Sequence, residues 1–351
     1  MKYNEFSELK YFECLDFLRF ISIALVIWHH TGSELMGHSP SNIAFGHYGV
    51  NMLFAISGFL ITTLLLRERK KYGSISYPKF FMRRLLRIFP LYYLSLLIYS
   101  FLVYFFEKNP ERANDFWNNI PYFITYTSNF FVDLKSYGTI FFFSWSLATE
   151  EQFYIFWPIL MMLFSNRVGL FFMIGLVTLK VFIGLLPNQN DLTYVLAKIP
   201  YSICISSALA ILMFWESSFN KVIKFFTFRN APVLYLLLTF VIFFTGSAEL
   251  NMTLPAVMSF LVISSIMTKD FTFRKIFTKE IFVSLGKVSY GMYLLHMICA
   301  NIIKKTLVSF GLPINPVLYF ILTTILTYGV SLFSFNTFER YFLNLKHKFA
   351  V

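Results

Sequence analysis

The stretch FLRFISIALVIWHH, from Phe17 to His30, is apolar but carries one arginine near its start and two histidines at its end. With its flanking residues it approaches the roughly 20 residues that an α-helix needs to cross the hydrocarbon core of a bilayer. Similar apolar runs recur along the rest of the 351-residue chain. The stretch is therefore interpreted as the first of several membrane-spanning helices.

The composition of the chain is that of a membrane protein. Hydrophobic residues make up 57% and charged residues 14% of the sequence, whereas soluble domains carry about a quarter charged residues. A net charge of +12 would favour nucleic-acid binding in a soluble protein, but here Lys and Arg cluster between apolar runs. That arrangement is typical of cytoplasmic loops facing anionic lipid headgroups. We expect contact with membrane lipid and no nucleic-acid partner.

The three cysteines, Cys14, Cys204 and Cys299, lie singly in apolar sequence. An odd number without paired spacing argues against a disulfide framework and against a zinc site. No metal is expected.

Windows of about 19 residues identify ten candidate spans. They lie near residues 14–32, 46–66, 88–106, 141–164, 168–186, 195–215, 231–248, 252–268, 285–305 and 315–340. The apolar stretch Tyr122–Leu134 is short, so it is interpreted as interfacial or re-entrant, with an eleventh span as the alternative. The expected fold is an all-α integral membrane bundle of about ten transmembrane helices. Residues 1–351 are expected to form a single domain without internal repeats and without an appended soluble domain.

Basic residues predict the orientation of this bundle. With ten spans, three basic runs fall on the same side of the membrane: Arg67–Arg87, Asn220–Arg229 and Lys269–Lys279. Because basic loops stay in the cytoplasm, both termini are predicted to be cytoplasmic, in a protein that crosses the plasma (inner) membrane several times. Lys304 and Lys305 fall on the outer side and fit this orientation less well.

Charges inside the first predicted span indicate function, because a charge in hydrocarbon costs at least a few kcal/mol. Arg19 and His30 are eleven residues apart. On an ideal α-helix they would lie within roughly 20° of one face and about 16 Å apart along the axis. Asp16 lies one turn before Arg19 and can pair with it. The alternative is that Arg19 snorkels to the interface and that the histidines only anchor the other end.

Two further clusters place charge near or within predicted spans. Arg84 and Arg87 share a helix face just before the third span, so they can bind a phosphate together; a positive-inside flank is the alternative. Glu150 and Glu151 interrupt the aromatic fourth span, with Tyr154 one turn after Glu150. Carboxylates at this depth should be paired, protonated or lining a polar cavity, unless water reaches them at a helix end.

Two other spans carry small or polar residues at helical spacing. Ser289, Tyr293 and His296 recur at spacings of four and three, so they are predicted to share one stripe of the ninth span. The histidine on this stripe is interpreted either as a hydrogen-bonded core residue or as a lining residue of a site. Ser57 and Gly58 in the second span are predicted to allow close helix approach.

Five segments, in this order, resemble motifs of the membrane-bound acyltransferase family 3: LDFLRFISIALVIWHH, GVNMLFAISGFLIT, RRLLRIFPLYY, WSLATEEQFYIFWP and SYGMYLLHM. The resemblance covers nearly the whole chain. Members of the family include O-acetyltransferases of cell-surface polysaccharides, lipo-oligosaccharides and related glycans. The resemblance therefore implies an acyl donor, usually acetyl-coenzyme A, that enters from the cytoplasm, and a glycan or lipid-linked saccharide as acceptor.

The resemblance also implies roles for single residues. Arg19 and His30 match a paired arginine and histidine of the family, and Arg84 and Arg87 match a basic pair that holds the phosphates of the donor. The assigned residues are His30 and Glu150 as catalytic, Arg19, Arg84 and Arg87 as donor-binding, and Asp16, Ser289, Tyr293 and His296 as substrate-lining. Asn51 replaces an aspartate that is common in the family, which leaves the role of position 51 open.

General chemistry agrees with these roles. A neutral imidazole can take the proton of a sugar hydroxyl as that hydroxyl attacks a thioester carbonyl. Glu150 can orient His30 or stabilise its charged form. Direct transfer and an acyl-histidine intermediate are both compatible with the sequence.

Two other functional classes suit a bundle with internal charges. A proton-coupled secondary transporter also uses intramembrane His, Glu and Arg, but usually shows repeated halves. A flippase-like or scaffold protein of glycan export would use the same charges to hold a lipid phosphate. The acceptor sugar, the acyl chain length and the oligomeric state are not encoded in any recognisable motif.

Overall fold

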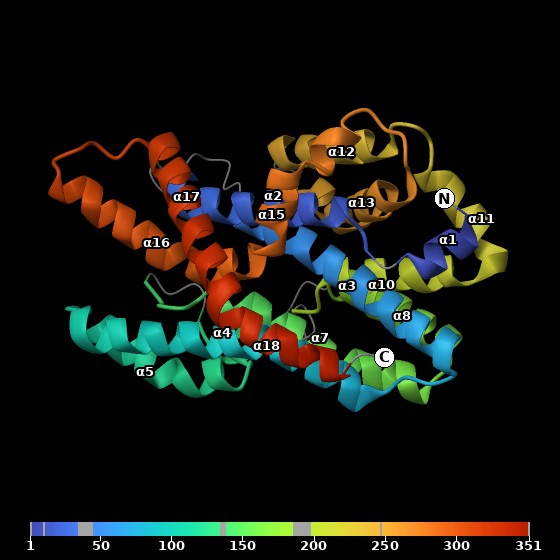
Figure 1. Ribbon diagram of the computed structural model, residues 1–351, viewed down its shortest axis with the longest axis horizontal. Coiled ribbons are helices and arrows are strands. Elements are labelled where there is room, and N and C mark those ends of the chain that lie inside the picture. The colour runs from blue at the N-terminus through green and yellow to red at the C-terminus, as the bar shows by residue number, and fades with distance from the viewer. Residues whose placement is uncertain are drawn as a thin grey trace. The chain divides into compact units, whose positions relative to one another are not determined.

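The computed structural model describes residues 2–9, 11–33, 45–133, 138–184, 198–245 and 248–349. Every secondary-structure element within these ranges is helical, which confirms the all-α class (Figure 1). Five helices are long and apolar enough to cross a membrane, and up to seven spans result if each of two bent helix pairs counts as one. The chain is thus a multi-pass membrane protein, and the number of ten spans stays a prediction.

The bounds of the helices follow the apolar runs. The long ones are α2 (Cys14–Trp28), α3 (Phe45–Tyr72), α4 (Tyr77–Phe106), α7 (Ser144–Leu163), α8 (Asn166–Gly184), α13 (Ala248–Met267), α16 (Ser289–Ser309) and α17 (Pro316–Ser334). The shorter ones are α1 (Tyr3–Glu8), η1 (His29–Ser33), α5 (Pro110–Ile124), α6 (Ser128–Phe131), α10 (Tyr201–Phe214), α11 (Glu216–Phe226), α12 (Ala231–Thr245), α14 (Arg274–Phe277), α15 (Glu280–Lys287), η2 (Phe335–Glu339), α18 (Arg340–Leu345) and η3 (Lys346–Phe349).

Two stretches differ from a simple series of straight spans. The predicted span 285–305 is divided between α15 and α16, which meet at 74°; this corrects the expectation of one continuous helix. The stretch from Tyr122 is also broken: α5 ends at Ile124, and Tyr126 has a left-handed backbone with φ 53° before the four-residue α6. Up to Asp133 the stretch is therefore not one spanning helix, and Leu134 lies outside the described residues.

The chain divides into two compact units. Unit 1 comprises residues 1–73, 166–177 and 201–336, and unit 2 comprises residues 74–165, 178–200 and 337–351. Their helices come from interleaved parts of the sequence, so neither unit is one continuous segment.

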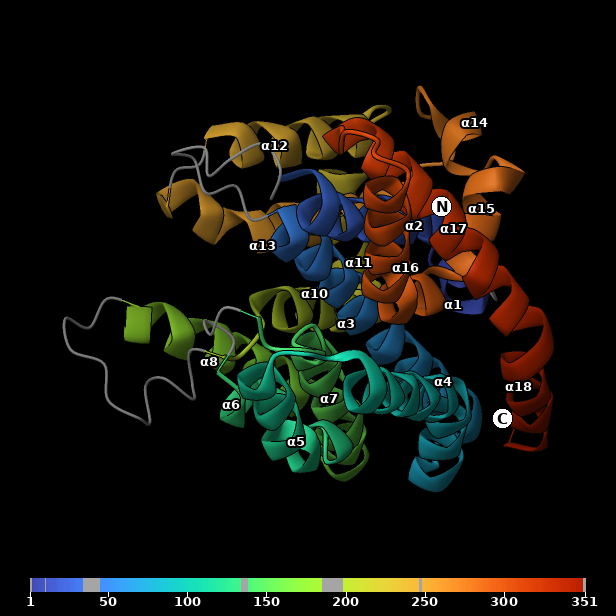
Figure 2. The same cartoon turned by 90° about the vertical axis from the view of Figure 1, so that its left-hand side faces the viewer.

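Glycines allow the helices at the centre of unit 1 to approach closely. A Cβ added at Gly49 on α3 would lie 2.3 Å from the carbonyl oxygen of Ser22 on α2. A Cβ at Gly58 would lie 2.5 Å from the carbonyl oxygen of Ile203 on α10. The predicted close approach at the Ser-Gly step of α3 is therefore confirmed, and α3 packs between α2 and α10. On another side of α2, α16 and α17 pack together and contact it (Figure 2).

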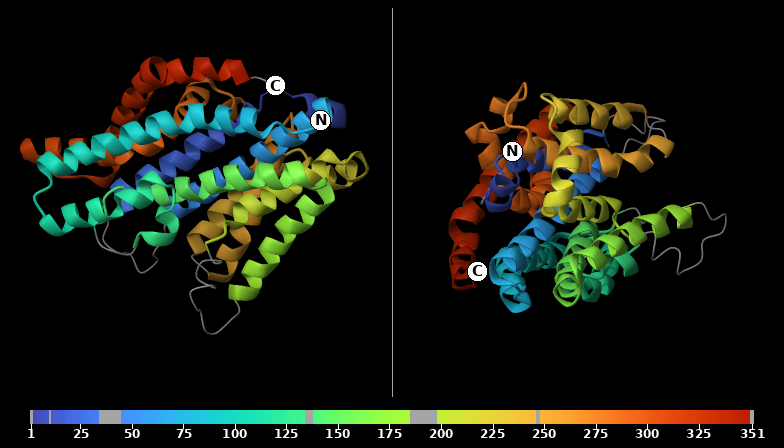
Figure 3. Two further views of the ribbon diagram at one scale, coloured as in Figure 1. Left: turned by 90° about the horizontal axis from the view of Figure 1, so that it is seen from below. Right: turned by 90° about the vertical axis from the view of Figure 1, so that its right-hand side faces the viewer.

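Unit 2 is built on α4, which contacts α5, α7, α18 and η3 (Figure 3). The Tyr92 hydroxyl on α4 donates to the carbonyl of Phe123 at 2.8 Å, and Gln152 on α7 donates to the carbonyl of Tyr126 at 2.8 Å. These bonds satisfy carbonyls around the turn after α5, where the helix has ended and supplies no further N–H donors to them.

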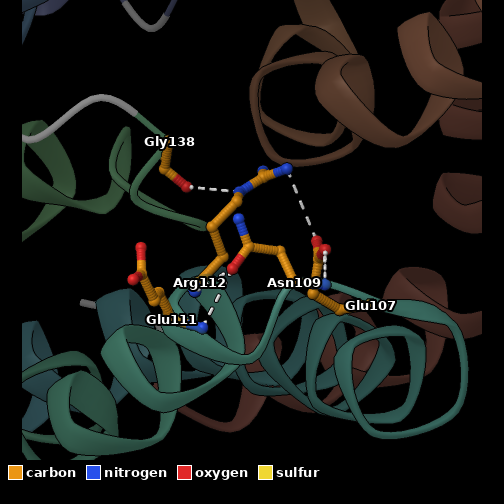
Figure 4. Close-up of polar contacts among 5 residues, drawn as sticks. All are labelled: Glu107, Asn109, Glu111, Arg112 and Gly138. Carbon is orange, nitrogen blue, oxygen red and sulfur yellow. Dashed lines mark hydrogen bonds and ion pairs between the residues drawn. The ribbon is translucent and has the colours of Figure 1, made fainter.

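The connection from α4 to α5 is fixed by polar contacts (Figure 4). Asn109 caps α5 by accepting hydrogen bonds from the backbone of Glu111 at 2.9 Å and Arg112 at 3.4 Å. The Arg112 side chain donates to the Gly138 carbonyl at 3.1 Å and lies 3.5 Å from a carboxylate oxygen of Glu107. The polar residues Asn109–Arg112 thus form the capped start of α5.

The basic run that begins at Arg67 is largely helical, because α3 extends to Tyr72 and α4 begins at Tyr77. Arg67 donates to the carbonyls of Phe6 and Leu9 and lies over two phenylalanine rings. This arginine therefore binds the N-terminal segment to α3. Such a structural role is not expected for a residue that only contributes positive charge to a cytoplasmic loop.

Candidate active site

The candidate residues divide between the two units. Unit 1 holds Asp16, Arg19, His30, Ser289, Tyr293 and His296, and unit 2 holds Arg84, Arg87 and Glu150. The predicted interaction of Glu150 with His30 joins one unit to the other and stays a prediction.

At the start of α2, Asp16 and Arg19 form an ion pair. The Arg19 Nη1 atom lies 2.6 Å from Asp16 Oδ1, and the Tyr11 hydroxyl donates to the other carboxylate oxygen. Asp16 is only 2% exposed, whereas Arg19 is 20% exposed. The carboxylate is thus buried with two donors, as a buried charge requires, and it orients a guanidinium that is partly exposed. The contact with Tyr11 has no signal in the sequence.

His30 lies just beyond the regular part of this helix. The α-helix ends at Trp28, and His29–Ser33 forms a π-helical turn. The predicted common face of Arg19 and His30 assumed an ideal α-helix up to His30. The regular α-helix ends at Trp28, so that geometry does not extend to His30. π-helical turns are rare and frequently occur at functional sites.

The structure brings His30 and His296 together. Their ring centroids are 5.2 Å apart with an angle of 33° between the planes, although 266 positions separate them in the sequence. His296 is fully buried, and its Nδ1 lies 2.6 Å from the Tyr293 carbonyl oxygen. A carbonyl only accepts, so Nδ1 carries the proton and Nε2 of the neutral ring is an acceptor.

The stripe predicted on the ninth span is buried within unit 1. Ser289, Tyr293 and His296 all lie on α16, with 9%, 4% and 0% exposure. The Tyr293 and His296 rings are 5.8 Å apart. This arrangement supports His296 as a hydrogen-bonded buried residue and also places it beside His30, so the two interpretations of this histidine are compatible.

In unit 2, α4 and α7 place an arginine against a tyrosine and two carboxylates. The Arg84 guanidinium lies 5.7 Å from the centroids of the Phe80 and Tyr154 rings. The Tyr154 hydroxyl donates to a carboxylate oxygen of Glu150, and both Glu150 and Glu151 act electrostatically on Arg84. Among the described residues, the contacts of Arg84 include the faces of these two aromatic rings.

Two residues of this region, Glu151 and Lys346, were assigned no role from the sequence. Glu151 is 3% exposed and is buried more deeply than Glu150, which is partly buried. Lys346, after the last apolar run, acts electrostatically on Arg83, Arg84 and Arg87. Its place beside α4 has no local signal, because it depends on how η3 packs.

Three cysteines, Cys14, Cys204 and Cys299, are free and buried. Within the described ranges, no three His, Cys, Asp or Glu side chains are grouped in a way that could hold a metal ion.

Comparison with known proteins shows which family the sequence belongs to. A family model described as an acyltransferase domain, of the acyltransferase 3 type, matches residues 12–335. The chain belongs to this acyltransferase family. The matched range contains the ion pair on α2, the two facing histidines and the Arg84–Tyr154–Glu150 group.

Curated relatives include proteins of Staphylococcus aureus and Listeria monocytogenes. A protein of Staphylococcus aureus (strain COL), whose name includes the term O-acetyltransferase, is 26% identical over 347 residues, covering 91% of this chain and 55% of the relative. Peptidoglycan O-acetyltransferase OatA of Listeria monocytogenes is 26% identical over 316 residues, covering 82% and 49%. O-acetyltransferase OatA of S. aureus (strain NCTC 8325) is 29% identical over 202 residues, covering 53% and 32%. The chain thus spans about half the length or less of these relatives. No solved structure matches it.

Proposed function

We propose that this protein is a membrane-embedded O-acyltransferase that moves an acyl group, acetyl in the first instance, from acyl-coenzyme A to a glycan hydroxyl. The observation that carries the proposal is the His30–His296 pair in a chain of the acyltransferase family. Relatives named O-acetyltransferase, one of them for peptidoglycan, support a cell-surface or lipid-linked glycan as acceptor.

His30 is the proposed general base. Its neutral imidazole takes the proton of the acceptor hydroxyl as the hydroxyl oxygen attacks the thioester carbonyl. The tetrahedral intermediate then collapses, the carbon–sulfur bond breaks, and the proton held by His30 passes to the leaving thiolate. His296, with Nε2 as an acceptor, can orient an N–H of His30 and so direct its other ring nitrogen to the hydroxyl.

The donor is proposed to bind from the cytoplasmic side through arginines. Arg84 and Arg87 present guanidinium groups, which suit phosphate oxygens because they donate two parallel hydrogen bonds. Arg19, oriented by Asp16, is the third residue proposed to bind the donor. Donor binding from the cytoplasmic side is part of the proposed topology, in which both termini are cytoplasmic and the protein lies in the plasma membrane.

The test of catalysis compares neighbouring histidines. In liposomes with radiolabelled acetyl-coenzyme A and mixed cell-surface glycans, His30→Ala should reduce label transfer by about 10²–10⁴-fold, the usual contribution of a general base. His29→Ala is the matched control and should retain most of the activity, since His29 packs beside Gly46 and does not take part in the proposed step. Full activity of folded His30→Ala protein would remove His30 from the chemistry.

The test of the donor site uses Arg84 and Arg87. Replacement of both by alanine should raise the apparent KM for acetyl-coenzyme A more than the KM for the acceptor. Arg112→Ala, beyond the opposite end of α4, is the control and should leave both values unchanged. An unchanged donor KM in the double variant would contradict phosphate binding by this pair. Transport of an intact solute without acyl transfer would instead favour a proton-coupled transporter.

A further inference from the structure

The C-terminal part of unit 2 lies along the arginine-bearing half of α4. Both α18 and η3 contact α4 (Figures 1 and 3). The Arg83 side chain donates to the Phe349 carbonyl of η3 at 2.9 Å. This hydrogen bond fixes η3 against the helix turn that also carries Arg84, and it places Lys346 at the start of η3 in the same neighbourhood.

The charges around Lys346 are all of one sign. Its electrostatic partners are Arg87, Arg84 and Arg83. It is partly buried, and it forms no salt bridge within the part of the chain that the structure describes. Arg84 differs, because Glu150 and Glu151 balance it from the side of α7. Within the described residues, no negative charge is among the groups that act on Lys346.

Like charges held together in a partly buried place destabilise the fold unless an anion joins them. Burial, together with the positive charges of the three arginines, lowers the pKa of the Lys346 ammonium from 10.5 to about 8. Because no described residue gives Lys346 an acidic partner, a bound anion can fill that role. A phosphate oxygen supplies such a partner, because ammonium and guanidinium groups both bind phosphate strongly.

We propose that Lys346 on η3 joins Arg84 and Arg87 on α4 to form one phosphate-binding site, in which η3 covers the donor phosphates of coenzyme A. The assignment of the phosphate to coenzyme A rests on the proposed function. The same chemistry would also fit the phosphate of a lipid headgroup, and the two sources predict different results.

Chemical labelling of lysines tests the site without measuring activity. The protein, in nanodiscs of neutral phosphatidylcholine, is treated briefly with an amine-reactive reagent, and Lys346 and Lys348 are quantified by mass spectrometry. Lys348 is the internal control because it is exposed on the same short helix. S-methyl-coenzyme A should slow labelling of Lys346 severalfold, because a bound phosphate raises its pKa and covers it. S-methyl-pantetheine, which has no phosphate, should not.

Variants give the second measurement. Lys346→Gln should weaken binding of S-methyl-coenzyme A about tenfold, the loss expected for one charge-assisted hydrogen bond, whereas Lys348→Gln should bind as the wild type does. If S-methyl-coenzyme A binds the wild type but neither protects Lys346 nor depends on it, the inference is wrong and the donor role of the arginines is unaffected. If S-methyl-coenzyme A does not bind at all, the proposed function itself fails. Protection by phosphatidylglycerol nanodiscs alone would overturn the donor assignment and identify a lipid phosphate.

Discussion

Substitution of Gly286 by alanine should disrupt the candidate site from a distance. A Cβ at this position on α15 would lie 2.1 Å from the carbonyl oxygen of Asp16 and 2.6 Å from its Cα. A carbon and a carbonyl oxygen normally approach no closer than about 3.3 Å, so α15 and α2 would have to separate by about 1 Å. Both contacting atoms belong to backbone, and a change of rotamer therefore cannot relieve the clash.

The magnitude follows from two opposing effects. Overpacking of a tight contact costs about 1–3 kcal/mol, and a gap of this size elsewhere along the interface forfeits a quarter to a half of the local dispersion energy. Replacing glycine by alanine within a helix stabilises the helix by up to about 1 kcal/mol, which opposes this loss. We expect Gly286→Ala to lower the free energy of unfolding by about 2 kcal/mol. It should also lower donor affinity, because Asp16 orients Arg19 through a 2.6 Å contact.

Unfolding in nanodiscs, followed by denaturant titration, measures this change, and binding of labelled coenzyme A reports on the site. Gly329→Ala on α17 is the matched control, since a Cβ added at Gly329 would have no neighbouring atom within 4 Å. That variant should be as stable as the wild type or up to about 1 kcal/mol more stable. If both variants unfold like the wild type, the close contact between α15 and α2 does not exist in the protein.

Three further substitutions separate structural from electrostatic roles. Arg67→Ala should lower the free energy of unfolding by about 2 kcal/mol or more in the same titration, because two carbonyls lose a charged donor; a change below about 0.5 kcal/mol would contradict this. Arg112→Ala should cost at most about 1 kcal/mol, since its ion pair is exposed, and a larger loss would show that the cap region matters more. The lowered pKa of Lys346 means that its charged form destabilises the native state. Ligand-free Lys346→Gln should therefore be more stable than the wild type below about pH 8, and this advantage should shrink as the pH rises from about 8 to 10.5; a pH-independent difference would refute it.

Local patterns in the sequence were sufficient for features that depend on neighbouring residues. The apolar runs coincide with helices because a bilayer leaves a helix as the simplest way to satisfy the backbone. The ion pair of Asp16 with Arg19 follows from a spacing of three residues. The close helix approach at Gly58 follows from the absence of a side chain.

Other features could not be derived because they depend on where helices end and turn. The 74° angle between α15 and α16 interrupts an apolar run that has no proline. The π-helical turn at His29–Ser33 changes the helical phase where the apolar run gives way to the polar residues HHTGS, and this composition marks the end of the run without indicating how the backbone turns. Hydropathy averages over about 19 residues, and such local changes of backbone geometry disappear in the average.

The sequence by itself determined a helical membrane protein, its family motifs and most of the residues that carry charge into the bundle, because each of these depends on residue type and short spacing. Only the tertiary structure decided which of these residues meet. His30 faces His296, and η3, which carries Lys346, contacts the arginine-bearing half of α4; both contacts join segments more than 250 positions apart. Such contacts arise from the packing of whole helices against one another, which no spacing along the chain records.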